Sequence, residues 1–147
     1  METRTPLKSL NSDTRTYVIF INKSSRRARA WWLDFKGKPV SYGDISPNGT
    51  LRMNTFLTHP WVFRVTENGA KLLANRQEVY YPTLSENKDI ITVNITTPVY
   101  SLRECCLMVI RRLVKRRDLN RLEIPEMLKH DLVTVPDLSK ELEIMNS

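Results

Sequence analysis

The sequence changes in character near Pro98, and this change constrains the fold more than any other feature. The 3 Trp, 5 Tyr and 4 Phe residues of the 147-residue chain all lie at or before Tyr100, and its 4 glycines all lie in the first half. Aromatic side chains favour β structure and glycines favour tight turns, so two signals of a β domain stop together. We therefore place a domain boundary near Pro98. A chain of this length holds one ordinary domain, or one modest domain with a small addition.

Before the boundary, short segments of strand-forming side chains alternate with turn residues. Such spacing is typical of a β sandwich or barrel, in which each strand buries one face. In one segment, alternation places Met53 and Thr55 on one face and Asn54 and Phe56 on the other. The predicted strands span residues 17–21, 30–35, 51–56, 61–65, 71–74, 78–81 and 90–96, with turns at 34–39 and 46–49.

After the boundary, apolar residues recur at the spacing of a helix face. Ser101 and Glu104 form a capping box that marks the helix start. Two shorter helical segments follow, with Pro125 and Pro136 at first helical positions, which tolerate a residue without an N–H group. The apolar face of the first helix contains Leu102, Cys106, Val109, Ile110 and Leu113, and that of the last contains Leu138, Leu142 and Met145.

The predicted fold class is therefore α+β. We expect an N-terminal β sandwich followed by a small helical domain, with a C-terminal helix that packs back on the sandwich. The predicted parts are an N-terminal segment at 1–13, a β domain at 14–98 for substrate recognition, a helical domain at 99–135, and the C-terminal helix at 136–147.

The first helix is too apolar to be covered on one side only. Residues 105–110 are six consecutive apolar residues, so opposite faces of the helix need cover. At about 25 cal/mol per Å², leaving several such side chains in water forfeits several kcal/mol. The β domain or a partner protein supplies the cover, and the sequence leaves both open.

The formal net charge of +7 favours acidic partners. Its arginines and lysines form one cluster at 26–29 and another at 111–121. Nucleic acid is one candidate partner, but no zinc-finger spacing or RNA-binding signature accompanies the charges, and a solvated basic face explains them as well.

The chain has 2 cysteines, the adjacent Cys105 and Cys106, which cannot form a disulfide with each other without strain. We therefore expect a reducing compartment. No apolar run is long enough to span a bilayer, so we expect a soluble protein of the cytoplasm and nucleus.

Several motifs resemble those of a known family. The segment Ser101-Leu-Arg-Glu-Cys-Cys-Leu-Met-Val-Ile110 is similar to an elongin C-binding box. Pro98-Val-Tyr-Ser-Leu, Trp32-Leu-Asp-Phe-Lys-Gly and Thr58-His-Pro-Trp-Val-Phe-Arg64 resemble the von Hippel-Lindau tumour suppressor family, and the likeness runs from about Lys8 to the C-terminus.

The resemblance implies a substrate-recognition subunit of a cullin-RING ubiquitin ligase that is not itself an enzyme. Its substrate would be prolyl-hydroxylated hypoxia-inducible factor alpha, marked for ubiquitination and proteasomal degradation under oxygen control. The implied partners are elongin C with elongin B, and cullin-2 with its RING subunit. The elongin C-binding residues would be Ser101, Leu102, Cys106, Val109 and Ile110, and the cullin-binding residues Ile124, Pro125, Leu128 and Leu132.

The resemblance also implies a peptide-binding site for hydroxyproline. A pyrrolidine ring suits aromatic walls, and its hydroxyl needs a donor and an acceptor, which Thr55 and neutral His59 can supply. Asn54 stands where the family has His, Thr55 where it has Ser, Asp13 where it has a basic residue, and Gly43 where it has Pro. The implied binding residues are Trp32, Tyr42, Asn54, Thr55, His59, Trp61, Asn11, Met53 and Phe56.

Three alternatives compete with this interpretation. An enzyme is disfavoured because the two histidines, His59 and His130, lie in different predicted domains, and neither a third metal ligand nor a nucleophile–base pairing accompanies them. An elongin-binding adaptor without hydroxyproline selectivity and a basic nucleic-acid-binding module remain open.

Overall fold

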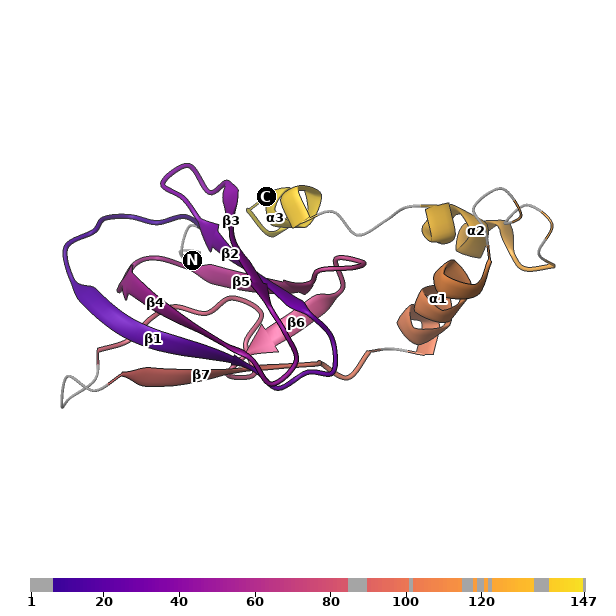
Figure 1. The fold of residues 1–147 in the computed structure, drawn as a ribbon. Coiled ribbons are helices and arrows are strands. Elements are labelled where there is room, and N and C mark those ends of the chain that lie inside the picture. Colours follow the sequence, from indigo (N-terminus) through magenta and orange to yellow (C-terminus); the bar gives the residue numbers. More distant parts are fainter. Residues whose placement is uncertain are drawn as a thin grey trace. The chain divides into compact units, whose positions relative to one another are not determined.

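A computed structural model shows a strand-rich part followed by helices (Figure 1). The structure describes residues 7–84, 90–100, 102–114, 118, 121, 123–133 and 138–146. Within this part, no helix is long and apolar enough to cross a membrane. The elements are β1 (Arg15–Asn22), β2 (Ala28–Leu33), β3 (Pro39–Ile45), β4 (Thr50–Phe56), β5 (Trp61–Val65), β6 (Lys71–Ala74), β7 (Ile91–Thr96), α1 (Leu102–Leu113), α2 (Glu126–Val133) and α3 (Leu138–Asn146).

The chain divides into two compact units. Met1–Pro98 and Asp137–Ser147 form the first, which we call the β unit, and Val99–Pro136 form the second, the helical unit. The α+β class is confirmed, because strands and helices occupy different stretches of the chain.

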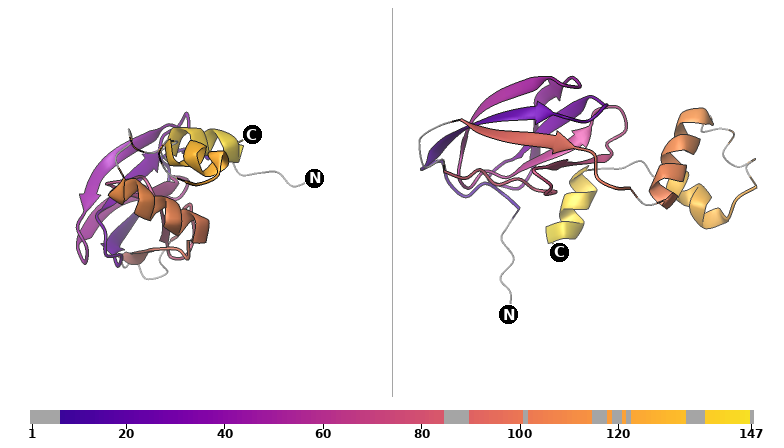
Figure 2. Two further views of the ribbon diagram at one scale, coloured as in Figure 1. Left: turned by 90° about the vertical axis from the view of Figure 1, so that its right-hand side faces the viewer. Right: turned by 90° about the horizontal axis from the view of Figure 1, so that it is seen from below.

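The seven described strands form one hydrogen-bonded order, β3-β2-β5-β6-β7-β1-β4. Neighbours are antiparallel except β1 and β7, which are parallel. The sheet curls into a near-barrel around one core (Figures 1 and 2), in which β6 pairs with both β5 and β7, and the two-sheet sandwich stays a prediction. In this strand order, β3 and β4 are the two end strands.

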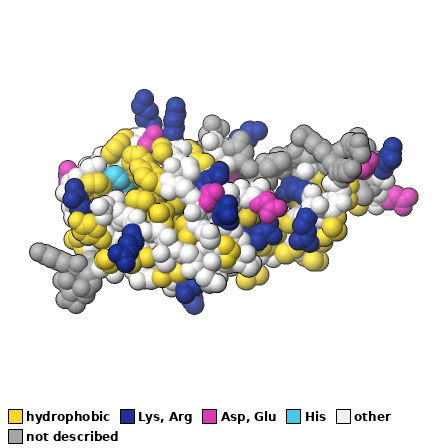
Figure 3. Space-filling model, in the orientation of Figure 1, with side chains coloured by type: hydrophobic (Ala, Val, Ile, Leu, Met, Phe, Trp, Pro, Cys, Tyr) yellow, Lys and Arg dark blue, Asp and Glu magenta, His cyan; other side chains and the backbone are white. Residues whose placement is uncertain are grey.

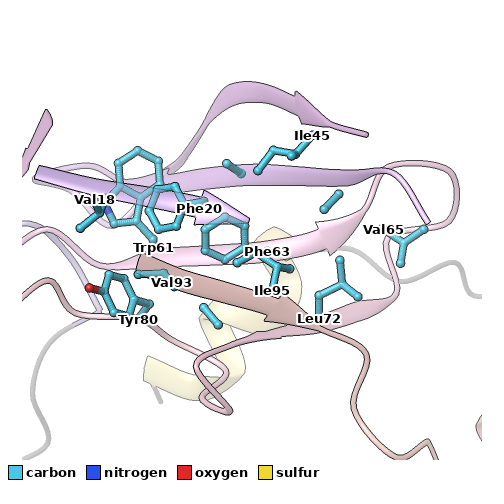
Figure 4. Close-up of a cluster of buried hydrophobic side chains, with 13 residues drawn as sticks. Val18, Phe20, Ile45, Trp61, Phe63, Val65, Leu72, Tyr80, Val93 and Ile95 are labelled. Carbon is cyan, nitrogen blue, oxygen red and sulfur yellow. The ribbon is translucent and has the colours of Figure 1, made fainter. Parts of the chain in front are cut away.

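The core is built around Phe20 of β1. Its ring lies 4.8 Å from that of Phe63, 5.3 Å from that of Trp61 and 6.1 Å from that of Tyr80, measured between centroids (Figure 4). Alternate residues of β1 are buried, as expected for a strand with one face on the core. Tilted and edge-on ring contacts of this kind add to the burial of the rings themselves.

Most predicted strands are confirmed within two residues at each end, but two predictions were wrong. Residues 78–81 form only an isolated bridge between Tyr80 and Trp61, because a single pair of hydrogen bonds joins them. Strand β3 was missed, and Pro39, Gly43 and Asp44 explain why, since these residue types are rare in strands. Pairing with β2 holds β3 in place, so tertiary contacts override the local preference.

Helix α3 packs on the outer side of β2 and β5 (Figures 1 and 2). Leu142 is buried together with Leu33 and Val62. The Arg64 side chain is only 5% exposed, and its guanidinium donates to the Glu141 carboxylate at 2.6 Å. These contacts place the last described helix in the β unit.

The helix ends differ slightly from the predictions. Helix α2 begins at Glu126, and the Pro125 carbonyl accepts a hydrogen bond from the Lys129 N–H at 3.2 Å. Pro125 is thus the capping residue and not the first helical residue. Ser101 and Pro136 lie outside the described residues, as does the side chain of Met145.

We predict that Tyr80→Phe raises the free energy of unfolding by about 1 kcal/mol. In the described part of the chain, the buried Tyr80 hydroxyl has no hydrogen-bond partner, while its ring packs against Phe20. Urea denaturation of the two proteins measures the difference. Tyr80→Leu is the control and should lower stability because it removes the ring; a loss of stability in Tyr80→Phe would contradict the prediction.

Candidate functional site

Five side chains of the β unit form a connected group that includes residues of both end strands, β3 and β4. We call Trp32, Tyr42, Thr55, His59 and Trp61 the aromatic site. The Tyr42 ring lies 5.2 Å from that of Trp61 and 6.1 Å from that of Trp32. The Trp32 and His59 rings are 5.3 Å apart. The five residues come from β2, β3, β4, β5 and the β4–β5 connection, so only the tertiary fold brings them together.

The Trp32 indole is held by a hydrogen bond that sequence reasoning missed. Its Nε1–H donates to Ser9 Oγ at 2.8 Å, and the Ser9 hydroxyl donates to the Leu33 carbonyl at 2.6 Å. Ser9 is only 2% exposed. The hydrogen bond to the Leu33 carbonyl orients the Ser9 hydroxyl. The Ser9 oxygen therefore fixes the orientation of the Trp32 indole before any ligand binds.

Thr55 and Trp61 form a buried polar pair in the site. Trp61 Nε1–H donates to Thr55 Oγ1 at 3.0 Å, and the two residues are 2% and 1% exposed respectively. A hydroxyl can accept and donate, and here the indole occupies one of its two acceptor positions. Among the described residues no acceptor for the Thr55 proton is found.

The tautomer of His59 follows from its partner. Nε2 lies 2.9 Å from the Asn11 carbonyl oxygen, which can only accept, so Nε2 carries the proton in neutral His59. Nδ1 is then an acceptor. Burial lowers the pKa of His59 below its ordinary value, which outweighs the opposite effect of the Asn11 carbonyl, and this favours the neutral ring.

A second set of contacts holds the segment that precedes β1 against this histidine. Asn11 N–H donates to Thr58 Oγ1 at 3.0 Å, and the Thr58 hydroxyl donates to the Asn11 carbonyl at 3.0 Å. Ser12 Oγ lies 3.4 Å from His59 Nε2. Sequence reasoning missed the roles of Ser12 and Thr58, although Thr58 stands inside a motif that carried the resemblance.

Phe35 is another member that the sequence did not assign. Its ring lies 5.8 Å from that of Trp32 and 5.6 Å from that of His59, yet the residue is 48% exposed. Phe35 can be recognised as part of the site because it is an exposed phenylalanine in contact with two site residues. Figure 3 shows hydrophobic side chains gathered around a histidine on this face, with lysine or arginine side chains around them.

The remaining predicted peptide-binding residues fall into different places. Phe56 lies beside His59, with ring centroids 4.9 Å apart. Met53 faces inward and packs against the core. Asn54 is exposed on the opposite face of β4, across from Tyr17. The predicted division of β4 into two faces is confirmed by this pattern.

Gly43 of β3 has φ +103°, a conformation that proline cannot adopt because its ring holds φ near about −65°. The backbone next to Tyr42 therefore cannot match that of a family member with proline there. Asp13, the other departure, is exposed, and its N–H donates to Asn11 Oδ1 at 3.3 Å.

Helix α1 exposes an apolar stripe in the helical unit. Leu102, Val109 and Leu113 are 80%, 43% and 72% exposed, and Cys106 is also exposed. Ile110 is half-buried and lies less open than the other predicted elongin C-binding residues. Among the described residues of α1, none is buried.

The predicted cullin-binding residues are less uniform. Ile124 is half-buried and Pro125 is exposed, whereas Leu132 is 3% exposed. The Leu132 carbonyl accepts a hydrogen bond from Arg111 Nε at 3.3 Å, so Leu132 packs inside the structure and its side chain offers little surface. The side chain of Leu128 lies outside the described residues.

The basic cluster at 26–29 is largely neutralised within the β unit. Arg26 pairs with Glu67, and Arg29 pairs with Asp44 at 2.9 Å. The Arg29 guanidinium donates to the Asp44 carboxylate and lowers its pKa. Paired arginines are poorly placed for phosphate contacts, which weakens the nucleic-acid alternative.

The β unit contains a polar pair among aromatic rings, and the helical unit has an exposed apolar stripe. These two features together are typical of a receptor protein. One unit suits recognition of a small group, and the other suits docking to a protein.

Comparisons with known proteins agree. The VHL beta domain model matches residues 7–88, and the VHL box domain model matches residues 100–147. Protein Vhl of Drosophila melanogaster is 29% identical over 136 residues, which cover 81% of this chain and 76% of that protein. The chain belongs to the von Hippel-Lindau family, and it is a VHL-like substrate receptor.

We predict that His59 makes the β unit less stable as the pH falls below about 6.5. The unfolded chain has the ordinary histidine pKa and takes up a proton there, whereas burial lowers the pKa in the folded state. The free energy of unfolding should thus decrease from pH 7.5 to pH values near about 5.5, and His59→Gln should flatten this part of the profile. Urea denaturation at each pH measures it.

The control is His130→Gln, which changes an exposed histidine of α2. It should leave the pH profile close to that of the parent protein. An unchanged profile in His59→Gln would show that the site histidine does not carry the effect.

Proposed function

We propose that the chain is the substrate-recognition subunit of a cullin-RING ubiquitin ligase and that its aromatic site binds a hydroxylated proline. The observation that carries the proposal is that the Thr55 hydroxyl and the neutral His59 ring belong to the same aromatic site. The substrate would be prolyl-hydroxylated hypoxia-inducible factor alpha. Binding would lead to its ubiquitination and proteasomal degradation, under oxygen control in the cytoplasm and nucleus.

The hydrogen-bonding roles of the site match a secondary hydroxyl group. The Thr55 proton can be donated to the ligand oxygen, because Trp61 already occupies an acceptor position of Thr55. The ligand proton can be donated to Nδ1 of His59, because the Asn11 carbonyl keeps the imidazole proton on Nε2. Donor and acceptor roles are thus assigned before binding.

Discrimination against plain proline follows from the same arrangement. Without the hydroxyl, the buried Thr55 and His59 groups would lose their water and gain no partner, at about 1 to 3 kcal/mol each. A site built around a ligand hydroxyl rejects the analogue that lacks it far more strongly than an apolar pocket rejects an added group. Trp32, Tyr42 and Trp61 would enclose the ring.

The end position of β4 suits an extended peptide. In the strand order, β4 pairs only with β1, so its other edge is open among the described strands. An extended peptide can bind such an edge through main-chain hydrogen bonds while one side chain enters a neighbouring site. Proline is tolerated at an edge strand because it needs no N–H partner on its outer side.

For the helical unit, we propose binding to elongin C, which carries elongin B. Leu102 is the anchor, and Cys106 and Val109 continue the exposed stripe. Covering these side chains removes apolar area from water at about 25 cal/mol per Å². Ser101 and the half-buried Ile110 complete the predicted set.

Cullin-2 with its RING subunit is the proposed partner of the segment around α2. Ile124 and the exposed Pro125 precede α2 and would contact the cullin. Leu132 is buried and stabilises the packing of α2. Leu128 is retained as a contact from the family resemblance.

A second candidate is an elongin-binding adaptor that has lost hydroxyproline selectivity, because Asn54 replaces the family histidine. The exposed position of Asn54, on the face opposite Thr55, argues against this loss, since Asn54 is no part of the polar pair.

The test is the affinity of a proline-containing peptide with and without the hydroxyl, for protein made together with elongins B and C. We predict tighter binding of the hydroxylated peptide by about 100- to 10,000-fold. Thr55→Val should reduce this ratio by about 5- to 150-fold, and Thr55→Ser should keep it because the hydroxyl remains. Equal affinities of the parent protein for both peptides would refute the proposal.

We predict that Leu102→Asp abolishes co-purification with elongin C. A carboxylate in an apolar contact is strongly unfavourable. Arg112→Gln, also exposed on α1, is the control and should still co-purify. Measuring hydroxyproline-peptide binding of Leu102→Asp separates loss of elongin C binding from loss of folding. Full elongin C binding by Leu102→Asp would contradict the role of Leu102 as the anchor.

A further inference from the structure

The outer face of β4 carries an arginine close to the aromatic site. Burial alternates along β4, so Leu51, Met53 and Thr55 point inward and Arg52 and Asn54 point outward. Arg52 lies opposite Ile19 of β1 and is exposed. It therefore stands on the open strand edge that the proposed peptide would follow.

Arg52 differs from three of the other arginines of the β unit in its electrostatic surroundings. Arg26, Arg29 and Arg64 each pair with a carboxylate of this unit. In the described part of the chain, Arg52 has no such ion pair. The outward residues of the neighbouring strands are uncharged along most of this face, namely Tyr17, Ile19, Ile21, Thr92 and Asn94.

The distance along the strand defines which peptide residue would meet Arg52. Arg52 is three residues from Thr55, which corresponds to about 10 Å in a β-strand. A peptide strand on the same edge with its hydroxyproline beside Thr55 would place its third residue beside Arg52. Side chains alternate, so residues at an odd offset from the hydroxyproline point to the outer face, where Arg52 lies.

The opposite end of β4 has a different charge environment. The Arg15 guanidinium lies 6.0 Å from the centre of the Phe56 ring, and Asp13 is two residues before Arg15. The Leu57 N–H donates to the Thr14 carbonyl at 3.0 Å. This hydrogen bond fixes Thr14 at the Phe56 end of β4, and Asp13 directly precedes Thr14. This end therefore carries both a carboxylate and a guanidinium, whereas Arg52 has no carboxylate partner among the described residues, so an acidic side chain gains more on the Arg52 side.

We propose that Arg52 is a specificity-determining residue that binds an acidic side chain three positions from the hydroxyproline, on one side only. The inference rests on the proposed binding of a hydroxylated peptide along β4. It adds a charge requirement at a fixed spacing, and it names an extended peptide with an Asp or Glu at that position as the preferred substrate.

The experiment uses the full chain in complex with elongins B and C and a set of otherwise uncharged hydroxyproline peptides. Each peptide carries one Glu, placed two or three residues before or after the hydroxyproline, and Kd is measured by fluorescence anisotropy. We expect one of the two three-residue peptides to bind about two- to fivefold tighter than the peptide without Glu, since an exposed ion pair contributes modestly. The gain should shrink with added salt.

Two variants assign the effect to its residue. Arg52→Gln should abolish the gain, and Arg52→Glu should transfer it to a peptide with Lys at the same position. The matched control is Lys36→Gln, which removes an exposed cation of the β2–β3 turn and should leave the gain intact.

The outcomes separate the two proposals. If the parent protein distinguishes hydroxylated from plain peptide but gains as much from Glu at the two-residue positions, the Arg52 inference is wrong and the receptor proposal stands. A gain that survives Arg52→Gln, or disappears in Lys36→Gln, also overturns the inference. If the hydroxyl makes no difference, both proposals fail together.

Discussion

The hydrogen bond from the Trp61 indole to the Thr55 hydroxyl is the interaction on which the candidate site depends. It joins β5 to the end strand β4, and the two side chains are almost completely buried. The same indole ring contacts Phe20 in the core and Tyr42 in the site. Core packing therefore positions the site directly, and a change in the core near Phe20 would be felt at Thr55. Rigid support of this kind is what recognition of a single hydroxyl group requires.

In the proposed function, selectivity comes from hydrogen-bonding roles that the protein assigns before a ligand binds. Trp61 occupies one acceptor position of Thr55, and the Asn11 carbonyl holds the proton of His59 on Nε2. The Thr55 proton and the Nδ1 lone pair of His59 remain, and together they can donate to and accept from a hydroxyl group. Because burial disfavours the charged imidazole, this assignment is stable at neutral pH. The same side chains in a solvated position could exchange roles with water and would discriminate weakly.

Family resemblance and the folded structure together explain why Asn54 matters less than the sequence comparison indicates. Asn54 replaces a histidine, which raised doubt about hydroxyproline selectivity, but the alternation of β4 puts it on the outer face with Arg52. Thr55, which is proposed to bind the hydroxyl, lies on the inner face. Substitutions on the two faces of one strand can thus change different parts of recognition, the peptide flank on one side and the modified proline on the other.

The sequence by itself determined the order of strands before helices, the two faces of β4 and the apolar stripe of α1, because alternation and helical period are local properties of the chain. It did not reveal β3, whose Pro39, Gly43 and Asp44 disfavour a strand, nor the bonds of Ser9 and Thr58 to residues 23 to 47 positions away. Only the tertiary structure decided that Tyr42, Thr55 and Trp61 meet. Such contacts depend on strand pairing and curling across the whole β unit, which no local pattern encodes.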